Sequence, residues 1–333
     1  MDAESRADLI ARPPAEEVVT RAELLELLGS SRAPRHYIGL EVSGFLHLGS
    51  LLVAGAKVND FADAGCRCTI FLADWHTIIN DKLGGERDRI ARATRYYRDA
   101  FSMICPRAEI ITGTGLYEGD PSYWEGVLGV AGHMSLARAA RCLTIMGRSE
   151  DEKVSLSKLL YPPMQAADMH SMDIDIAHSG TDQRKIHMLA REAFPKMGWK
   201  VPVAVHHALL PGLSGPAGGK AGKMSKSDPA SGIFMHDTDE QIRKKISRAW
   251  CEAGATAGNP VLAIAAHLLR DGPLDIERPE RFGGNVTYAD RAALESDYAA
   301  KRLHPGDLKG AVADALVRAV APVRDRLGPD RVL

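Results

Sequence analysis

A strand, a glycine-containing turn, a helix and a second strand follow one another between residues 36 and 74, and this pattern limits the fold more than any other feature. The run 36–41 is β-branched and aromatic and stops at Ser43-Gly44, and residues 49–64 have a helical pattern. The apolar run 68–74 is typical of a strand buried on both faces. Together they form a βαβ unit, which predicts an α/β fold with a doubly wound parallel sheet.

The rest of the chain extends this pattern and then changes. Further strands are expected at 108–112 and 174–178, and the expected helices of the first part are 16–28, 87–103, 124–146, 157–169 and 181–194. Beyond Asp237 the amphipathic stretches are 241–250, 261–269 and 309–327. We therefore predict an α/β domain over residues 1–237, with a helical insertion at about 115–160, and an all-α domain over 238–333.

Composition narrows the functional classes. The net charge of −1 excludes a cationic footprint over the whole surface, so any nucleic acid must be held by local basic patches. The five cysteines form no CxxC pair, which favours reduced core thiols in a cytoplasmic protein over disulfides or a zinc site. No segment has the roughly 18 apolar residues of a membrane span, and the N-terminus is unlike a signal peptide.

A candidate phosphate site lies at the first strand-to-helix turn, in the run His47-Leu48-Gly49-Ser50. A helix N-terminus presents unpaired N–H groups, and Gly44 and Gly49 let the backbone approach a phosphate closely. The imidazole of His47 can donate a hydrogen bond to a phosphate oxygen during phosphoryl transfer. Taken alone, the tetrapeptide is weak evidence, because a histidine in a turn is more often structural.

The second candidate is the uninterrupted run Lys-Met-Ser-Lys-Ser at residues 223–227. It lies in a stretch rich in glycine and serine, which suits a loop that closes two ammonium groups over a triphosphate. A solvated basic loop is the alternative. No GxxxxGK[ST] pattern follows a strand, which disfavours a P-loop enzyme.

These two motifs resemble the HIGH and KMSKS signatures of class I aminoacyl-tRNA synthetases, which have a Rossmann-like catalytic domain. Four further segments, YIGLEVSGFLHLG, FLADWH, YPPMQAAD and DQRKIH, follow in the order of the tyrosyl-tRNA synthetases of the archaeal and eukaryotic type. The resemblance covers Tyr37 to Leu327. It implies that the chain activates tyrosine with ATP and Mg²⁺, transfers it to tRNA and forms a homodimer.

The resemblance also implies a role for individual residues. Tyr37 and Asp168 would bind the phenolic hydroxyl of tyrosine, and the α-amino group would be held by Tyr161, Gln165 and Gln183. Further expected substrate contacts are Gly39, Glu41, Phe71 and His76. The expected catalytic residues are His47, Lys223 and Lys226. ATP would be bound by Gly44, His47, Gly49, Ser50, Lys223, Met224, Ser225, Lys226 and Ser227. No carboxylate cluster with ligand spacing indicates a dedicated metal site.

Helical spacing supports this assignment independently. Gln165 and Asp168 follow Tyr161 by four and seven residues, so all three share one face of a helix. A polar cluster on an otherwise apolar helix requires a polar ligand, although Asp168 could instead cap or pair internally. An apolar wall around the ring could be formed by Phe71, Leu116, Met169 and Met172, each of which could equally be core.

The last third of the chain holds the expected RNA contacts. The segments around Phe282 and around His304 and Asp307 resemble the two segments that bind the anticodon in this family. Phe282 would stack on a base and Asp307 would accept hydrogen bonds from a guanine edge. From the residues alone, Phe282 would be a core aromatic and Asp307 a helix N-cap. The acceptor stem could be contacted by the arginines Arg138, Arg141 and Arg148, which could equally form a solvated helix face.

Departures from the family keep alternatives open. Val42 replaces the usual proline, Ser50 replaces the second histidine of HIGH, and residues 114–117 depart from the usual pocket residues. The alternatives are a tryptophanyl-tRNA synthetase, a paralogue that activates a tyrosine-like amino acid, and a catalytically silent tRNA-binding module. Tyr37 with Asp168 argues against tryptophan. Intact His47, Lys223 and Lys226 argue against the silent module.

Overall fold

The computed structural model describes residues 1–147, 155–217, 220–224 and 230–328. The chain divides into two compact units. The first contains residues 1–44 and 54–208, and the second contains residues 45–53 and 209–332. This division falls between Ala208 and Leu209, whereas the functional boundary at residue 237 remains a prediction.

The first unit is built on a six-stranded sheet in the order β1-β6-β5-β2-β3-β4. Its strands are β1 (Ala15–Val19), β2 (Arg35–Leu40), β3 (Arg67–Leu72), β4 (Glu109–Thr112), β5 (Ile176–Gly180) and β6 (Val203–His207). All neighbours pair in parallel except β1, which is antiparallel to β6. The order reverses between β2 and β5, so the predicted doubly wound sheet is confirmed.

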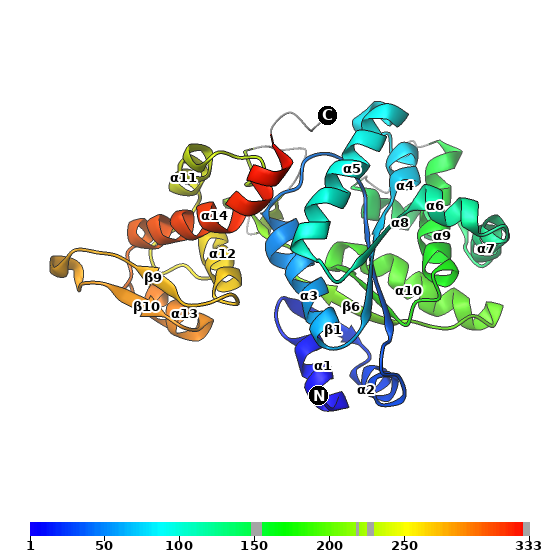
Figure 1. Ribbon diagram of the computed structural model, residues 1–333, viewed down its shortest axis with the longest axis horizontal. Coiled ribbons are helices and arrows are strands. Elements are labelled where there is room, and N and C mark those ends of the chain that lie inside the picture. Colours follow the sequence, from blue (N-terminus) through cyan, green and yellow to red (C-terminus); the bar gives the residue numbers. More distant parts are fainter. Residues whose placement is uncertain (148–154, 218–219, 225–229, 329–333) are drawn as a thin grey trace. The chain divides into compact units, whose positions relative to one another are not determined.

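Helices cover this sheet on both faces. They are α1 (Ala3–Ala11), α2 (Arg21–Ser30), α3 (Ala56–Asp63), α4 (Asp74–Ile79), α5 (Arg87–Ile104), α6 (Gly113–Gly119), α7 (Tyr123–Gly132), α8 (Leu136–Cys142), α9 (Leu156–Ser171) and α10 (Arg184–Ala193). Short 3₁₀ turns are η2 (Lys82–Gly85), η3 (Leu143–Met146), η4 (Thr181–Gln183) and η5 (Phe194–Met197). Figure 1 shows α3 and α5 side by side over one face, as right-handed crossovers between β2, β3 and β4 require.

Three sequence expectations about the first half of the chain need correction. The expected helix 16–28 is the strand β1 followed by α2, because β1 pairs with β6 and a capping box formed by Thr20 and Glu23 starts the helix only afterwards. Strand β5 extends to Gly180 because Gly180 still pairs with His207. The expected helix 49–64 begins as the π-helical segment η1 (Gly49–Gly55) before α3.

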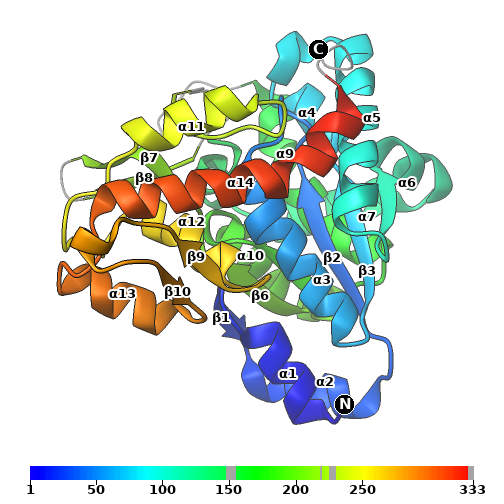
Figure 2. The same ribbon diagram turned by 60° about the vertical axis from the view of Figure 1, so that its left-hand side comes forward.

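The second unit is mainly helical. Its helices are α11 (Asp239–Arg248), α12 (Pro260–Leu268), α13 (Arg291–Ala299) and α14 (Pro305–Leu327), with a 3₁₀ turn η6 (Glu280–Phe282). Helix α14 packs against α11 and α12 (Figure 2). This unit also contains β7 (Pro211–Ala217), which pairs with β8 (Lys220–Lys223). The expectation of helices alone over residues 238–333 was incomplete, because β9 (Leu274–Ile276) pairs with β10 (Val286–Tyr288).

The cysteines behave as the sequence indicates. All five are buried and free, and burial raises the pKa of the Cys66 and Cys105 thiols to about 12. The described residues contain no helix that is long and apolar enough to cross a membrane.

Candidate functional site

The candidate amino acid site lies in the first unit, near the carboxyl ends of β2 and β5, where the strand order reverses. Ligands of open α/β sheets bind at such a switch point. Tyr37 on β2 is buried, and its hydroxyl lies against Gly39, where an added Cβ would come within 2.5 Å of the hydroxyl oxygen. Glycine at position 39 is therefore required by the tyrosine two residues earlier.

Asp168 forms the polar centre of this site. The side chain lies on α9 and is completely buried. Its Oδ1 accepts hydrogen bonds from the hydroxyls of Tyr123 at 2.8 Å and Tyr117 at 3.1 Å. Burial raises the pKa of the carboxyl to about 8, although both tyrosine hydrogen bonds act to lower it. The Asp168 charge contributes, after burial itself, to raising the pKa of Tyr37.

The alternative that Asp168 pairs internally is therefore correct for one oxygen only. Oδ2 has no hydrogen-bond partner among the described residues. His76 on α4 places Nε2 3.6 Å from this oxygen, and Nε2 has no hydrogen-bond partner in that set either. Burial lowers the pKa of His76 to about 3, so the imidazole is neutral. Two buried polar atoms thus remain for a ligand.

A second polar group lies on the same helix. Gln165 Nε2 donates to Gln183 Oε1 at 3.4 Å, and Gln183 Nε2 donates to the Ile145 carbonyl at 3.0 Å. Gln165 Oε1 is buried without a partner among the described residues. Tyr161 packs edge to face against His76 with ring centroids 4.4 Å apart. The structure thus brings the predicted α9 residues to one face.

Glu41 follows β2 and contributes a carboxylate. Its Oε1 accepts a hydrogen bond from Asn80 Nδ2 at 2.8 Å, and Asn80 Nδ2 also donates to the Met146 carbonyl. The Glu41 charge is, after burial itself, the largest contribution that raises the pKa of Tyr161. A carboxylate and the unpartnered Gln165 oxygen are suitable groups for binding an ammonium group.

The four residues considered for an apolar wall belong to or pack against one hydrophobic cluster. Phe71 lies 6.1 Å from the ring of Tyr37, and Phe71 and Met169 are buried in one cluster with Tyr37 and Tyr161. Leu116 and Met172 are partly buried against that cluster.

Two residues of this site were missed from the sequence. Tyr123 was not singled out, and Tyr117 was noted only as part of an altered segment. Their rings stack with centroids 4.0 Å apart, and both hydroxyls reach Asp168 from α6 and α7. The available signal was indirect: a buried Asp168 requires donors.

Val42 also has a structural explanation. Its backbone N–H donates to Thr77 Oγ1 at 3.0 Å, a bond that the proline usual in the family could not form. Gly44 has φ +142°, a conformation that favours glycine.

The second unit contains both phosphate-site motifs. Leu48 N–H donates to the Ile233 carbonyl, and Met235 N–H donates to the Leu46 carbonyl, both at 2.9 Å. His47 forms a bridge with Phe234 between these bonds. The motif at residues 47–50 is therefore paired with residues 233–235, which follow the motif at residues 223–227 in the chain.

This pairing orients the imidazole of His47. Nδ1 accepts from the Gly49 N–H at 3.0 Å, so a neutral ring carries its proton on Nε2. A Cβ at Gly49 would lie 2.7 Å from the ring. Ser50 is buried and its N–H donates to the His47 carbonyl at 2.8 Å.

The KMSKS segment is described in part. Met224 is buried, and its N–H donates to the Leu210 carbonyl at 2.9 Å. A Cβ at Gly232 would lie 2.4 Å from Met224 Cγ, so this methionine anchors the segment. The side chain of Lys223 and all of Ser225, Lys226 and Ser227 lie outside the described residues.

The predicted anticodon residues are in the second unit. Phe282 is 58% exposed with the Arg281 guanidinium 4.9 Å from its ring centroid, so the core interpretation was wrong. His304 is the N-cap of α14, with Nδ1 accepting from the Gly306 N–H at 3.0 Å. Asp307 lies in the first turn of that helix rather than at its cap.

The three arginines considered for the acceptor stem differ. Arg138 pairs with Glu192 at 3.0 Å, whereas Arg141 is exposed. Arg148 lies outside the described residues.

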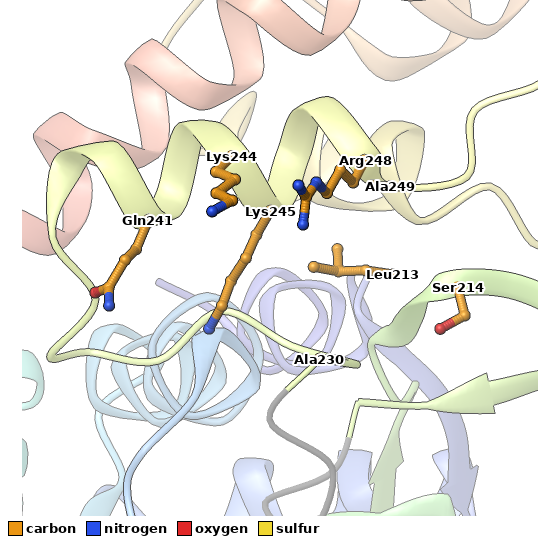
Figure 3. Close-up of a pocket in the computed structure, with 8 residues that line it drawn as sticks. All are labelled: Leu213, Ser214, Ala230, Gln241, Lys244, Lys245, Arg248 and Ala249. Atoms are coloured by element: carbon orange, nitrogen blue, oxygen red, sulfur yellow. The ribbon is translucent and has the colours of Figure 1, made fainter.

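A basic cavity of about 360 Å³ lies beside α11 (Figure 3). It is lined by Leu213, Ser214, Ala230, Gln241, Lys244, Lys245, Arg248 and Ala249. Lys245 pairs with Asp237 at 2.6 Å. Lys244 and Arg248 are exposed, and in the described part of the chain neither cationic group has an acidic partner.

Comparisons with known proteins agree on one family. The family model described as tRNA synthetases class I (W and Y) matches residues 30–321. The chain is 42% identical to a tyrosine--tRNA ligase of Thermococcus sibiricus, covering 98% of this chain and 95% of the relative. It is 44% identical to that of Aeropyrum pernix, covering 97% and 93%.

Solved structures give the same result. The tyrosyl-tRNA synthetase of Pyrococcus horikoshii complexed with L-tyrosine is 38% identical, with a TM-score of 0.91 over 98% of this chain and 96% of the other. That of Archaeoglobus fulgidus complexed with L-tyrosine is 38% identical, with a TM-score of 0.90 over 98% and 100%.

Proposed function

Because this chain belongs to the class I tRNA synthetases for tryptophan and tyrosine and is a tyrosine--tRNA ligase of the archaeal type, we propose that the cluster around Asp168 binds the phenolic end of tyrosine. The observation that supports this placement most is that two buried atoms, Asp168 Oδ2 and His76 Nε2, have no hydrogen-bond partner within the described parts of the chain. A phenolic hydroxyl between them satisfies both. Phenylalanine would leave them unpaired, and enzymes that bind a substrate hydroxyl in this way discriminate strongly. Tyrosyl-tRNA synthetase is the standard example of that discrimination.

The same proposal assigns the other end of the amino acid. The ammonium group would be held by Tyr161, Gln165 and Gln183, with the carboxylate of Glu41 nearby. Gln165 Oε1 is buried and can accept a hydrogen bond from that group. Phe71 would contact the ring. Gly39 would leave room for the Tyr37 hydroxyl.

We propose that activation uses ATP. The tyrosine carboxylate attacks the α-phosphorus, a P–O bond to the pyrophosphate group breaks, and tyrosyl-adenylate forms. His47 would donate from Nε2 to a phosphate oxygen because Nδ1 is already an acceptor. Lys223 and Lys226 would neutralise charge on the phosphates as the bond breaks.

We propose that Mg²⁺ would bind together with ATP, through the phosphates of the nucleotide. The described residues contain no group of three or more His, Cys, Asp or Glu side chains that could hold a metal ion. Mg²⁺ commonly binds substrate phosphates with few protein ligands.

The second reaction transfers tyrosine to tRNA. The terminal ribose hydroxyl of the tRNA attacks the aminoacyl carbonyl, and AMP leaves. We propose that Lys244 and Arg248 on α11, which have no acidic partner among the described residues, bind RNA phosphates, which contribute much of the affinity for nucleic acid. The exposed Phe282 would stack on an anticodon base. His304 and Asp307, which lie close to one another in the chain, would also contact the anticodon.

A homodimer is also part of the proposal. The helices α7 and α8 expose the large apolar side chains Trp124 (46%), Leu128 (67%) and Leu136 (72%). Trp124 and Leu128 are four residues apart on one helix face. Exposed apolar side chains gathered on a surface indicate a protein interface. A Leu128→Lys variant should then elute as a monomer in size-exclusion chromatography with light scattering, and an unchanged dimer would exclude this face.

We propose that the enzyme is located in the cytoplasm. All five cysteines are free thiols, and tRNA is its substrate, both of which are compatible with that location.

The decisive experiment is amino-acid-dependent ATP–pyrophosphate exchange. The panel contains tyrosine, tryptophan, phenylalanine and ring-substituted tyrosines. We expect tyrosine to support the highest kcat/KM. Exchange driven only by a substituted tyrosine would identify a specialised paralogue, and no exchange with any amino acid would contradict the activation chemistry.

A further inference from the structure

The hydroxyl of Tyr117 contacts both polar side chains at the phenol end of the site. It lies 3.1 Å from Asp168 Oδ1 and 3.5 Å from His76 Nδ1. A tyrosine hydroxyl has one hydrogen to donate and lone pairs that accept. Asp168 Oδ1 also accepts from Tyr123, which has no hydrogen bond to His76 among the described residues. Tyr117 is therefore the residue that connects Asp168 to His76.

The protons of this group can be placed by elimination. Asp168 Oδ1 is an acceptor, so Tyr117 gives its single hydrogen to that oxygen. The hydroxyl oxygen can then only accept from His76, which requires the His76 proton on Nδ1. Since His76 is neutral, its Nε2 carries a lone pair. Nε2 and Asp168 Oδ2, 3.6 Å apart, both face the same position without a partner among the described residues.

We propose that Tyr117 is a positioning residue that fixes His76 Nε2 as a hydrogen-bond acceptor beside Asp168 Oδ2, so that the end of the amino acid site selects a side chain able to donate a hydrogen bond. The inference rests on the proposed function. A phenolic hydroxyl donates to His76 Nε2 and accepts from Asp168, whose raised pKa keeps a proton that must lie on Oδ2, because Oδ1 already accepts two hydrogen bonds. An O-methyl ether or a bare ring cannot donate, and would leave His76 Nε2 buried and unpaired.

Packing alone would not give this result. The ring of Tyr117 stacks on Tyr123 and lies 6.4 Å from Trp75 and 6.3 Å from Trp124. A phenylalanine keeps these ring contacts and removes only the hydroxyl. Tyr117→Phe therefore separates the hydrogen bonds from the packing.

The test compares three Tyr→Phe variants by pyrophosphate exchange with tyrosine, phenylalanine and O-methyl-tyrosine. Tyr117→Phe should lower the ratio of kcat/KM for tyrosine over phenylalanine by about 10- to 100-fold, because the buried Nε2 of His76 is then no longer held as an acceptor for the substrate hydroxyl. Tyr123→Phe should lower it less, since His76 keeps its tautomer. Tyr288→Phe is the matched control, because Tyr288 donates to Asp297 Oδ2 at 2.8 Å in the second unit. It should leave the ratio unchanged.

A ratio for Tyr117→Phe within about twofold of the wild type, or an equal loss in Tyr123→Phe, would overturn the proposal. The tautomer is read independently of any variant by ¹⁵N NMR of histidine-labelled wild-type protein, with His76→Gln used only to assign the signal. We expect the proton on Nδ1, and a proton on Nε2 would overturn the inference. If the wild type shows no exchange with tyrosine, the proposed function fails, while the tautomer measurement still tests the geometry.

Discussion

Replacing Asp168 by asparagine should stabilise the protein increasingly as the pH rises. The carboxyl is completely buried, and burial raises its pKa to about 8, against about 3.9 in an unfolded chain. Between these values the folded protein keeps a proton that the unfolded chain has released, so the free energy of unfolding falls as the pH rises. Asparagine has no such proton. Its carbonyl can still accept from Tyr117 and Tyr123, and its amide can donate to His76 Nε2.

The size of this stability difference follows from the pH range over which Asp168 is protonated in the folded protein and ionised in the unfolded chain. Between pH 5 and pH 8 the slope is about 1.4 kcal/mol per pH unit, so the stability difference between Asp168→Asn and the wild type should grow by about 4 kcal/mol. The assay is urea unfolding at pH 5, 6, 7 and 8 without tyrosine. Tryptophan fluorescence reports on the relevant unit, which contains Trp75, Trp124 and Trp199.

The control is Asp297→Asn in the second unit. Asp297 also accepts from a tyrosine hydroxyl, but a hydrogen bond from Arg302, the main cause, lowers its pKa. Its carboxylate is therefore ionised in both states over this range, and its difference from the wild type should not grow with pH. A stability difference for Asp168→Asn that stays flat within about 1 kcal/mol would refute a protonated Asp168 in the free protein.

Three further predictions concern other parts of the molecule. Gly39→Ala should raise the KM for tyrosine in exchange assays, because a Cβ there would lie 2.5 Å from a tyrosine hydroxyl and overpacking costs about 1–3 kcal/mol; Gly29→Ala, with nothing within 4 Å, should be neutral. Lys244→Ala and Arg248→Ala should each reduce the salt dependence of tRNA binding by about one unit of slope and leave pyrophosphate exchange unchanged, and an unchanged slope would exclude phosphate contacts. Burial, the main cause, holds the pKa of His178 well below 6.5, so stability should fall by about 1.4 kcal/mol per pH unit for this group as the pH drops below 6.5. Urea unfolding of the wild type and of His178→Gln at pH 5 and 6.5 would show this as a stability difference that changes with pH, and a constant difference would contradict it.

The interior of the sheet could be predicted from local patterns, and its edges could not. The apolar run ending at Leu72 is a buried parallel strand because nearly every side chain in it is apolar. The segment beginning at Ala15 carries two glutamates, so it lacks such a signal. It is a strand because β6 offers it a partner and because Glu17 accepts from Arg184 and His206.

The candidate site divides in a similar way. Helical spacing predicted that Tyr161, Gln165 and Asp168 share a face, because 3.6 residues per turn is a local property. Tyr117 and Tyr123, 51 and 45 residues before Asp168, could not be assigned by any local rule. Their positions depend on how α6 and α7 pack near α9.

By itself, the sequence determined the parallel α/β architecture, the two phosphate-site motifs and, through resemblance, tyrosine as the substrate. Those features depend on short runs whose periodicity and order are visible along the chain. The tertiary structure alone decided that Asp168 uses Oδ1 internally and leaves Oδ2 to face His76, and that Leu48 pairs with Ile233. Hydrogen bonds between residues far apart in the chain form only after the elements have packed, so their donors and acceptors cannot be counted from spacing.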